Sequence, residues 1–355
     1  MFLIKSLQQS SLADIRDKIA DKTKPIGALG QLEKVAEQLA LIQSNEPQQS
    51  GQKIVINKPT AFVFAGDHGI AAQNVSIAPS DVTRQMVLNF LQGGAAINCF
   101  CQSNNIDFYV VDAGIKVALS DEEKTNAAYL IEKRLGAGTA DITLAAAMTE
   151  AQVKQGLWFG KEVALSAVEQ GSNLLMFGEM GIANTSAASA IFMALSGLSA
   201  EQCVGQGTGI TEQQLMAKRI LLTKAVKRAS QAVEEFTPEN ILAQLGGFEI
   251  VQITGAILAA AEAGISILID GFIVTSAALI AVEMHPEVRE YLIFAHQSNE
   301  NAHQLMLEQL NAKPLLNLDL RLGEGTGAAL AFPLLRCAVS FYNDMASFDS
   351  AGVMV

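Results

Sequence analysis

A single acidic residue, Glu324, stands between two glycines in the stretch RLGEGTGAAL, residues 321–330. Glycine has no side chain, so Gly323 and Gly325 leave the carboxylate open to a ligand. The alanine-rich segment that follows predicts a helix with Thr326 as its N-cap. Backbone N–H groups at a glycine-rich helix start can bind an anion. The stretch therefore indicates a carboxylate that a ligand can reach, beside an anion site, although an acidic residue that only complements a helix dipole is the commoner meaning of one such motif.

Polar residues also end a series of short apolar runs. The runs span 60–69, 107–114, 173–181, 265–272 and 290–298. Long helical stretches separate them, a pattern that is typical of buried parallel strands in an α/β fold. Right-handed crossovers place the carboxyl ends of such strands on one edge of the sheet, where ligands bind. The side chains expected at that edge are Asp67, His68, Asp112, Glu179, Met180, Asp270, His296 and Ser298.

The segment after the first run offers a place for a flat ligand. An irregular loop at 74–79 contains Ser76, and a helix that begins at Ser80 or Asp81 carries Gln85 and Met86. A flat aromatic ligand fits under Met86 with a hydrogen bond to Gln85, while a methionine in the core is the competing interpretation. Ser76, Gln85 and Met86 are therefore candidate binding residues.

Two further glycine-rich loops lead into predicted helices. The first, GEMGIANTSAASA, places Glu179 and Met180 at a strand end, where Glu179 is either a catalytic carboxylate or the partner of a cation. In the second, VGQGTGITEQQLMAKR, Lys218 lies about two turns into the helix, where a solvated surface lysine is the competing interpretation. Neither loop has the dinucleotide fingerprint G-x-G-x-x-G, and the chain has no Walker lysine.

A phosphate group on a ligand would then have to be bound without such a motif. Helix starts at the carboxyl edge predict that backbone N–H groups at Gly181 to Asn184 or at Gly325 to Gly327 hold it. Ser298 and Arg321 are the side chains expected to help. No Gly-x-Ser-x-Gly elbow surrounds Ser298, which argues against a serine hydrolase.

Composition excludes several classes of protein. The net charge of −12 over 355 residues argues against a nucleic-acid partner, which needs a basic face. The most apolar region, 251–283, is broken by acidic residues, so no membrane span is expected. The four cysteines have no metal-ligand spacing, which predicts buried free thiols in a reducing cytoplasm. Asp67-His68 lacks a second cluster, so neither a metal nor a cofactor is expected.

The N-terminal part of the chain has a different character. Residues 1–43 show helical spacing with one interruption near Pro25, and the polar segment 44–58 is typical of a linker. The composition, half hydrophobic but only 6% aromatic, favours helices packed closely on a parallel sheet.

From about residue 24 to the end, the motifs resemble the nicotinate-nucleotide–dimethylbenzimidazole phosphoribosyltransferase family. They read KPIGALG, AGDHGI, VTRQMVLNFLQGGAAIN, GEMGIANTS, GFEI, DGFIVTSAAL and PLLNLDLRLGEGTGAAL. The resemblance implies transfer of phosphoribose from nicotinate mononucleotide to 5,6-dimethylbenzimidazole, for the lower ligand of cobalamin. It implies a Rossmann-like α/β domain at 59–330, with helices on both faces of a parallel sheet. It also implies a small helical domain, from 1–58 and about 331–355, and a cytoplasmic homodimer.

The resemblance also implies roles for individual residues. Glu324 matches the general base of the family, and Glu179 and Lys218 match positions that line the site. Ala183 stands where the family usually has glycine, Ala28 replaces a common serine, and SIAP at 76–79 lacks an aromatic residue before its proline. The last difference lies in the loop near the base pocket and bears on which base is preferred.

The chemistry agrees with these residues. In the donor, nicotinate is already a pyridinium, so the leaving group needs neither a proton nor a metal. The attacking azole nitrogen is neutral. A carboxylate must take the azole N–H proton as the new bond forms. We expect Glu324 to stay ionised, because the positive end of a helix dipole favours the charge. Alternatives are transfer to adenine, another benzimidazole or a phenol, a nicotinamide-dependent oxidoreductase, and a non-enzymatic sensor of a base or nucleotide.

Overall fold

A six-stranded parallel sheet forms the centre of the molecule. The structure is a computed structural model that describes residues 2–44, 53–125, 127–207 and 209–354. The strands, in the spatial order β3-β2-β1-β4-β5-β6, are β1 (Thr60–Gly66), β2 (Asp107–Gly114), β3 (Leu130–Glu132), β4 (Leu174–Met180), β5 (Ser266–Ile269) and β6 (Leu292–Phe294). This arrangement confirms the predicted Rossmann-like α/β fold.

The five predicted strands are present, and one strand was missed. β3 is only three residues long, lies at the edge of the sheet and is partly exposed, so its sequence lacks an apolar run. The strand order reverses at β1, which pairs with both β2 and β4. Open sheets of this order bind ligands in the crevice outside the carboxyl ends of the strands at such a reversal.

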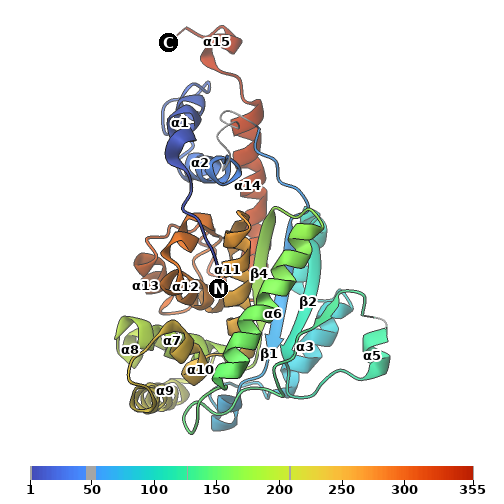
Figure 1. Ribbon diagram of the computed structural model, residues 1–355, viewed down its shortest axis with the longest axis vertical. Coiled ribbons are helices and arrows are strands. Elements are labelled where there is room, and N and C mark those ends of the chain that lie inside the picture. The colour runs from blue at the N-terminus through green and yellow to red at the C-terminus, as the bar shows by residue number, and fades with distance from the viewer. Residues whose placement is uncertain (1, 45–52, 126, 208, 355) are drawn as a thin grey trace.

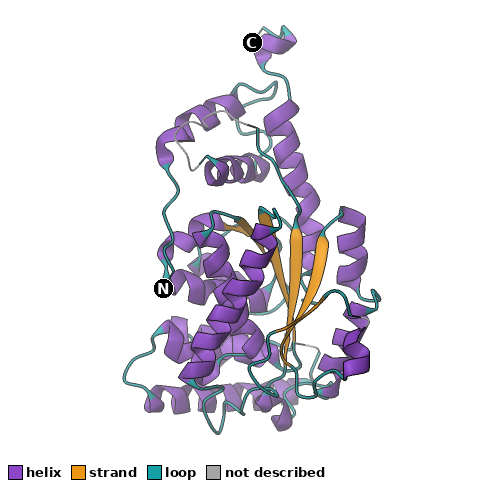
Figure 2. Cartoon of the chain, turned by 45° about the vertical axis from the view of Figure 1, so that its right-hand side comes forward, coloured by secondary structure: helices purple, strands orange, loops and turns teal. Residues whose placement is uncertain are grey.

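Helices cover both faces of the sheet, as predicted (Figure 2). α11 (Phe248–Glu262) is buried almost throughout and packs on β1, β2, β4 and β5, with α6 (Glu150–Glu169) packed against it. α4 (Ala96–Asn104) and α14 (Thr326–Asp344) pack together and contact β2 and β4 on the other face. The layers place the start of α14 at the carboxyl end of β4.

The remaining elements connect and flank these layers. The longer helices among them are α3 (Asp81–Leu91), α7 (Asn184–Ser196), α9 (Glu212–Ala232), α10 (Pro238–Leu245) and α12 (Phe272–Met284). The short ones are α5 (Asp121–Thr125), α8 (Ala200–Cys203), α13 (His303–Gln309), α15 (Phe348–Ala351), and the 3₁₀ helices η1 (Gln9–Ser11), η2 (Gly69–Gln73) and η3 (Pro286–Tyr291). Some of these helices begin at a capping side chain: Thr211 caps α9 by accepting a hydrogen bond from the N–H of Gln214, and Thr237 caps α10 by accepting one from the N–H of Asn240.

Helices from the N-terminal and C-terminal parts of the chain lie together (Figure 1). α1 (Leu12–Ala20) packs on α2 (Gln31–Gln43), and α2 packs on α14. The Lys22 ammonium also donates to the carbonyl of Met345, at 2.6 Å. We propose on this basis that residues 1–58 and about 331–355 form a small helical domain beside the α/β domain at 59–330. The boundary at 330 falls inside α14, which is continuous through both parts.

Several local predictions were wrong. Residues 2–8 form no helix, and part of the predicted linker at 44–58 lies outside the described residues. Gly325, rather than Thr326, is the N-cap of α14. All four cysteines are free, but Cys99 and Cys337 are exposed because their positions on α4 and α14 point away from the core. Over the described ranges, no helix combines the length and apolar character that crossing a membrane requires.

Candidate active site

A cavity of about 240 Å³ opens at the carboxyl ends of the central strands. Its wall combines residues that follow β4, β5 and β6 with residues from α3 and from the segment before α14. The sequence-predicted site residues that line it are Met86, Glu179, Met180, Gly181, Asn184, Ser298, Arg321 and Glu324. Residues far apart in the sequence therefore meet at the edge of the sheet where ligands are expected.

Glu324 lies in a left-handed turn between Gly323 and Gly325, with φ angles of 64°, 81° and 81° for the three residues. The turn buries Glu324 to 6% exposure. Burial, and then the nearby carboxylate of Asp270, raise the pKa of Glu324 to about 7. The expectation that the helix dipole keeps this carboxyl fully ionised was therefore wrong, because burial and a like charge outweigh the dipole.

The carboxylate of Asp270, a residue that follows β5, lies at the start of α14. Its two carboxylate oxygens accept hydrogen bonds from the backbone N–H groups of Gly325, at 3.2 Å, and Ala328, at 2.9 Å. Burial raises the pKa of Asp270, while His296 and these N–H groups act in the opposite direction. The predicted anion site at Gly325–Gly327 thus already holds a carboxylate of the protein. Thr326 lies outside the cavity wall, and its hydroxyl donates to the carbonyl of Gly323 at 2.7 Å.

Glu179 is a second carboxyl group of the cavity, and it is 5% exposed. The side-chain amide of Asn184 donates to it. Burial, followed by the charges of Asp270, Glu249 and Glu324, raises the pKa of Glu179 well above its usual value. Burial and these like charges therefore favour the protonated form of Glu179.

Lys218 lies behind the cavity rather than on the surface. The residue is 1% exposed, so the interpretation as a solvated lysine was wrong. Its ammonium donates to the hydroxyl of Thr185, a residue of the cavity wall, at 3.0 Å. Burial lowers the pKa of Lys218 to about 8, although Glu300 favours its charged form. The ammonium thus reaches the cavity through Thr185.

Apolar side chains cover another part of the wall. They are Ala78, Val82, Met86, Met180, Ile182, Phe272, Ile273, Val274 and Leu322. Gln85 is exposed and lines a separate cavity beside Arg84 and Lys116, away from Met86, because the two side chains diverge on α3. Met86 is thus the member of the predicted Gln85–Met86 pair that faces the carboxyl cluster.

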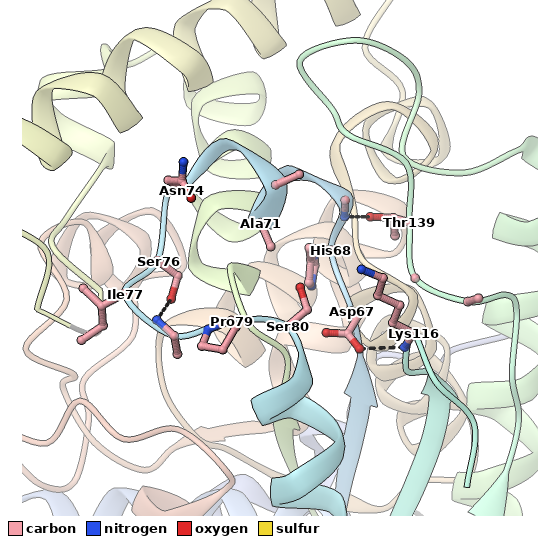
Figure 3. Close-up of a pocket in the computed structure, with 15 residues that line it drawn as sticks. Asp67, His68, Ala71, Asn74, Ser76, Ile77, Pro79, Ser80, Lys116 and Thr139 are labelled. Atoms are coloured by element: carbon pink, nitrogen blue, oxygen red, sulfur yellow. Dashed lines mark hydrogen bonds between the residues drawn. The ribbon is translucent and has the colours of Figure 1, made fainter. Parts of the chain in front are cut away.

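Ser76 lines a neighbouring cavity of about 440 Å³ (Figure 3). The figure shows Ser76 and Ser80 on one side of this cavity and Lys116 and Thr139 on the other. Ala78 lines both cavities, so the loop that carries Ser76 separates them. Ser76 itself accepts a hydrogen bond from the N–H of Ala78, at 3.2 Å.

The Asp67-His68 pair has hydrogen-bonded partners. His68 Nε2 lies 2.7 Å from an oxygen of Glu249, and Asp67 accepts from the N–H of Lys116 at 2.7 Å. His68 is thus a buried histidine that pairs with Glu249. In the part of the chain that the structure describes, no group of three His, Cys, Asp or Glu side chains is placed to hold a metal ion.

Sequence reasoning missed Thr185, Glu300 and Ala78 in the cavity wall. Thr185 follows Asn184 in the predicted helix start, so its position was visible but its link to Lys218 was not. Asp270 and His296 were placed at the sheet edge without a role.

Comparison with known proteins places this chain in a family. A family model described as a phosphoribosyltransferase matches residues 4–353, and the chain belongs to that family. A Vibrio parahaemolyticus protein named nicotinate-nucleotide–dimethylbenzimidazole phosphoribosyltransferase is 55% identical over 345 residues, which cover 97% of this chain and 98% of the relative. A Photobacterium profundum protein of the same name is 54% identical over all 355 residues and its own full length.

A solved structure agrees with these relatives. The crystal structure of CobT from Thermus thermophilus has a TM-score of 0.90 and 42% identity, and the match covers 97% of this chain and 99% of that one. The comparisons confirm the family resemblance that the motifs predicted.

Proposed function

We propose that this chain transfers phosphoribose from nicotinate mononucleotide to 5,6-dimethylbenzimidazole, which yields alpha-ribazole 5′-phosphate and nicotinate. The product supplies the lower ligand of cobalamin. The observation that carries the proposal is one cavity that joins Glu324, whose pKa is about 7, to an apolar wall at the carboxyl edge of the sheet. Relatives that match nearly the whole chain bear the name of this reaction.

Each bond change has a group to serve it. The bond from ribose C1′ to the pyridinium nitrogen breaks, and its electron pair stays on that nitrogen, so nicotinate leaves with a neutral pyridine ring. A benzimidazole nitrogen forms the new bond to C1′, and the proton on the other nitrogen passes to Glu324. A base with a pKa near the operating pH combines a large ionised fraction with enough basicity to hold that proton. Glu324 meets this condition.

The apolar wall suits a flat acceptor without charge. Met86 and Met180 line the same cavity as Glu324, and methionine adapts to aromatic surfaces. We assign the acceptor base to this wall and Gln85 and Ser76 to positions outside it. Transfer to adenine, another benzimidazole or a phenol is the alternative that a comparison of acceptors must decide.

The phosphate group belongs at the start of α7. The segment Gly181–Asn184 lines the cavity. Ser298 and Arg321, which lie more than 100 positions later in the sequence, line the same cavity. The segment Gly325–Gly327 is less suited to this role, because Asp270 already accepts hydrogen bonds from the N–H groups of Gly325 and Ala328. Lys218, held behind Thr185, adds positive charge near the α7 start.

Glu179 supports the transfer and does not accept the proton. Burial and like charges raise its pKa well above the usual value, which favours the protonated form, and that form cannot accept a proton. Together with Asn184, it lines the cavity beside Glu324 and fixes the polar side of the wall.

We also propose, from the family resemblance, that the chain works as a cytoplasmic homodimer. Light scattering after size-exclusion chromatography should give twice the mass of the 37.7 kDa chain. A monomer at the concentrations that support turnover would contradict the dimer and leave the activity assignment intact.

Product analysis tests the function directly. Purified protein with nicotinate mononucleotide and dimethylbenzimidazole should release nicotinate and a ribazole phosphate in equal amounts, as resolved by chromatography and mass spectrometry. Adenine, unsubstituted benzimidazole and a phenol should be assayed in parallel. Release of nicotinate with none of these acceptors consumed would refute the transfer, and preferred use of adenine would replace the assigned acceptor.

A further inference from the structure

Asp270 is a buried charged residue that directly follows β5. The residues that donate hydrogen bonds to it, Gly325 and Ala328, belong to the Glu324 turn and to the start of α14. We infer that Asp270 is a positioning residue for the phosphoribosyl transfer: it holds the turn that presents Glu324 and sets the charge against which that base works. The inference rests on the proposed role of Glu324 as the proton acceptor. It assigns a further task to a side chain that the reaction itself leaves unused.

The Glu324 turn needs an external support. Three consecutive residues, Gly323, Glu324 and Gly325, adopt left-handed backbone angles. Glycine tolerates this conformation, but Glu324 has a Cβ atom and does not favour it. A non-glycine residue persists in such a conformation only when its surroundings over-determine it. The contacts of the turn must therefore supply what the local sequence does not.

Two elements supply those contacts. Gly178 of β4 lies against the turn so closely that a Cβ atom there would be 2.4 Å from the carbonyl carbon of Glu324. From β5, Asp270 accepts the hydrogen bonds of Gly325 and Ala328 with separate oxygens, at 3.2 and 2.9 Å. These bonds fix the residue directly after Glu324 and the first turn of α14. A bidentate carboxylate thus sets where the base stands relative to the sheet.

The position of Asp270 is itself fixed. Asp270 is 2% exposed, and His296, after β6, places its Nε2 atom 3.7 Å from an oxygen of Asp270. The imidazole lies against α14, because a Cβ atom at Gly327 would be 1.9 Å from the His296 ring. The Nδ1 atom of His296 makes no hydrogen bond to the described residues. His303 of α13 lies behind, with burial lowering its pKa to about 3, and is neutral.

Asp270 acts on Glu324 through its charge as well as through its hydrogen bonds. The groups that face it are Glu324 before α14, Glu179 from β4, and His296 after β6. After burial, Asp270 is the cause that raises the pKa of Glu324, because two like charges in one cavity disfavour each other. A proton taken from the acceptor base is therefore held more firmly by Glu324 than it would be without Asp270.

Replacing Asp270 separates these two effects. Asp270→Asn has one acceptor oxygen where two N–H donors converge and carries no charge. We expect kcat on the order of 10- to 100-fold lower, because a small displacement of a catalytic group costs that much. The KM for nicotinate mononucleotide should stay near the parental value. The acidic limb of the kcat/KM profile should move to lower pH, since the pKa of Glu324 falls when the like charge is removed.

Asp270→Glu keeps the charge and moves both oxygens. It should lower kcat while the acidic limb stays near its parental midpoint. A parental kcat in Asp270→Glu would overturn the positioning role. This test holds even when Asp270→Asn does not fold.

Asp112→Asn is the matched control. Asp112 is also buried at the end of a strand of this sheet and accepts from two backbone N–H groups, of Gly114 and Ile115, but it does not line the cavity. Its replacement should lower the denaturation midpoint and leave the pH profile unshifted. If Asp270→Asn lowers stability as Asp112→Asn does, with the pH profile unshifted, Asp270 is only a structural cap and the inference fails.

Failure of the proposed function gives a different result. If Glu324→Gln turns over at the parental rate, Glu324 is not the base, and the premise is lost whatever Asp270 does. If Glu324→Gln is slow while both Asp270 variants keep the parental kcat and pH profile, the base assignment stands and the inference about Asp270 is overturned.

Discussion

Replacing Glu324 with glutamine should slow the reaction and, above neutral pH, stabilise the folded chain. The pKa of Glu324 is raised from 4.5 to about 7 by burial and by Asp270. The folded chain therefore binds a proton that the unfolded chain releases between these two pH values. A glutamine of nearly the same shape carries no charge at any pH and escapes that penalty.

The sign and size of the effect follow from proton linkage. Below pH 4.5 the carboxyl group is protonated in both the folded and the unfolded state, so the parent keeps the full contribution of this group to its free energy of unfolding. As pH rises through about 7, this contribution is lost, because the folded state must then hold a buried carboxylate. At about 1.4 kcal/mol per pKa unit, the loss amounts to about 3 kcal/mol. Glu324→Gln should thus exceed the parent by roughly that free energy of unfolding at pH 8 and by little at pH 4.5.

The rate should change in the opposite direction. With a pKa of about 7, the parent should retain roughly a tenth of its limiting kcat/KM at pH 6, where most of Glu324 is protonated. Glutamine cannot accept the proton, so kcat should fall by about 10²–10⁴-fold while both substrates still bind. The acidic limb should also disappear from the pH profile of the variant.

Urea unfolding from pH 4.5 to pH 8.5 and steady-state rates over the same range make the comparison. Glu37→Gln is the control, since a hydrogen bond from Arg16 lowers the pKa of Glu37 on α2, away from the cavity. The control should lose stability at neutral pH and keep its activity. A Glu324→Gln protein that is less stable than the parent at pH 8, or that keeps the acidic limb, would refute the reasoning.

Three further replacements test the surroundings of the base. Ala183→Gly should raise the free energy of unfolding by about 1 kcal/mol, because Ala183 caps α7 with a left-handed φ of 74°; an unchanged urea midpoint would contradict this. Ser298→Ala should mainly raise the KM for nicotinate mononucleotide in steady-state assays, and an effect on kcat alone would remove Ser298 from the phosphate site. Glu179→Gln should lower kcat by less than Glu324→Gln, since burial and like charges favour the protonated form of Glu179; a larger loss in a folded protein would reverse the two roles.

The fold followed from periodicity that the sequence shows directly. Five apolar runs became strands because each is buried on both faces between helices, as in β1, whose residues are all buried. β3 escaped prediction because three edge residues with partial exposure leave no such pattern. The N-cap of α14 was misplaced by one residue, because the left-handed Gly325 closes the turn and Thr326 bonds back to Gly323.

The members of the site were easier to predict than their protonation. Glu324, Glu179 and Asn184 come from motifs whose glycines mark close approach, so the sequence places them together. The pKa of Glu324 depends on Asp270, which lies 54 positions earlier in the chain. No local sequence pattern predicts that these two side chains lie close together in the fold. Lys218 shows the same limit: helical spacing cannot tell that Thr185 lies against its ammonium.

Three carboxyl groups, Glu179, Asp270 and Glu324, gather in a cavity where each raises the cost of charging its neighbours. Such an arrangement destabilises the free protein, and it becomes favourable when positive charge develops between them. In the proposed transfer, that charge appears on ribose C1′ and on the attacked azole while the bond to nicotinate breaks. An interaction that is stronger in the transition state than in the ground state raises the rate. On this proposal, the left-handed Glu324 turn and the carboxylate of Asp270 act together to keep negative charge in the cavity, and the free protein loses stability above neutral pH as a result.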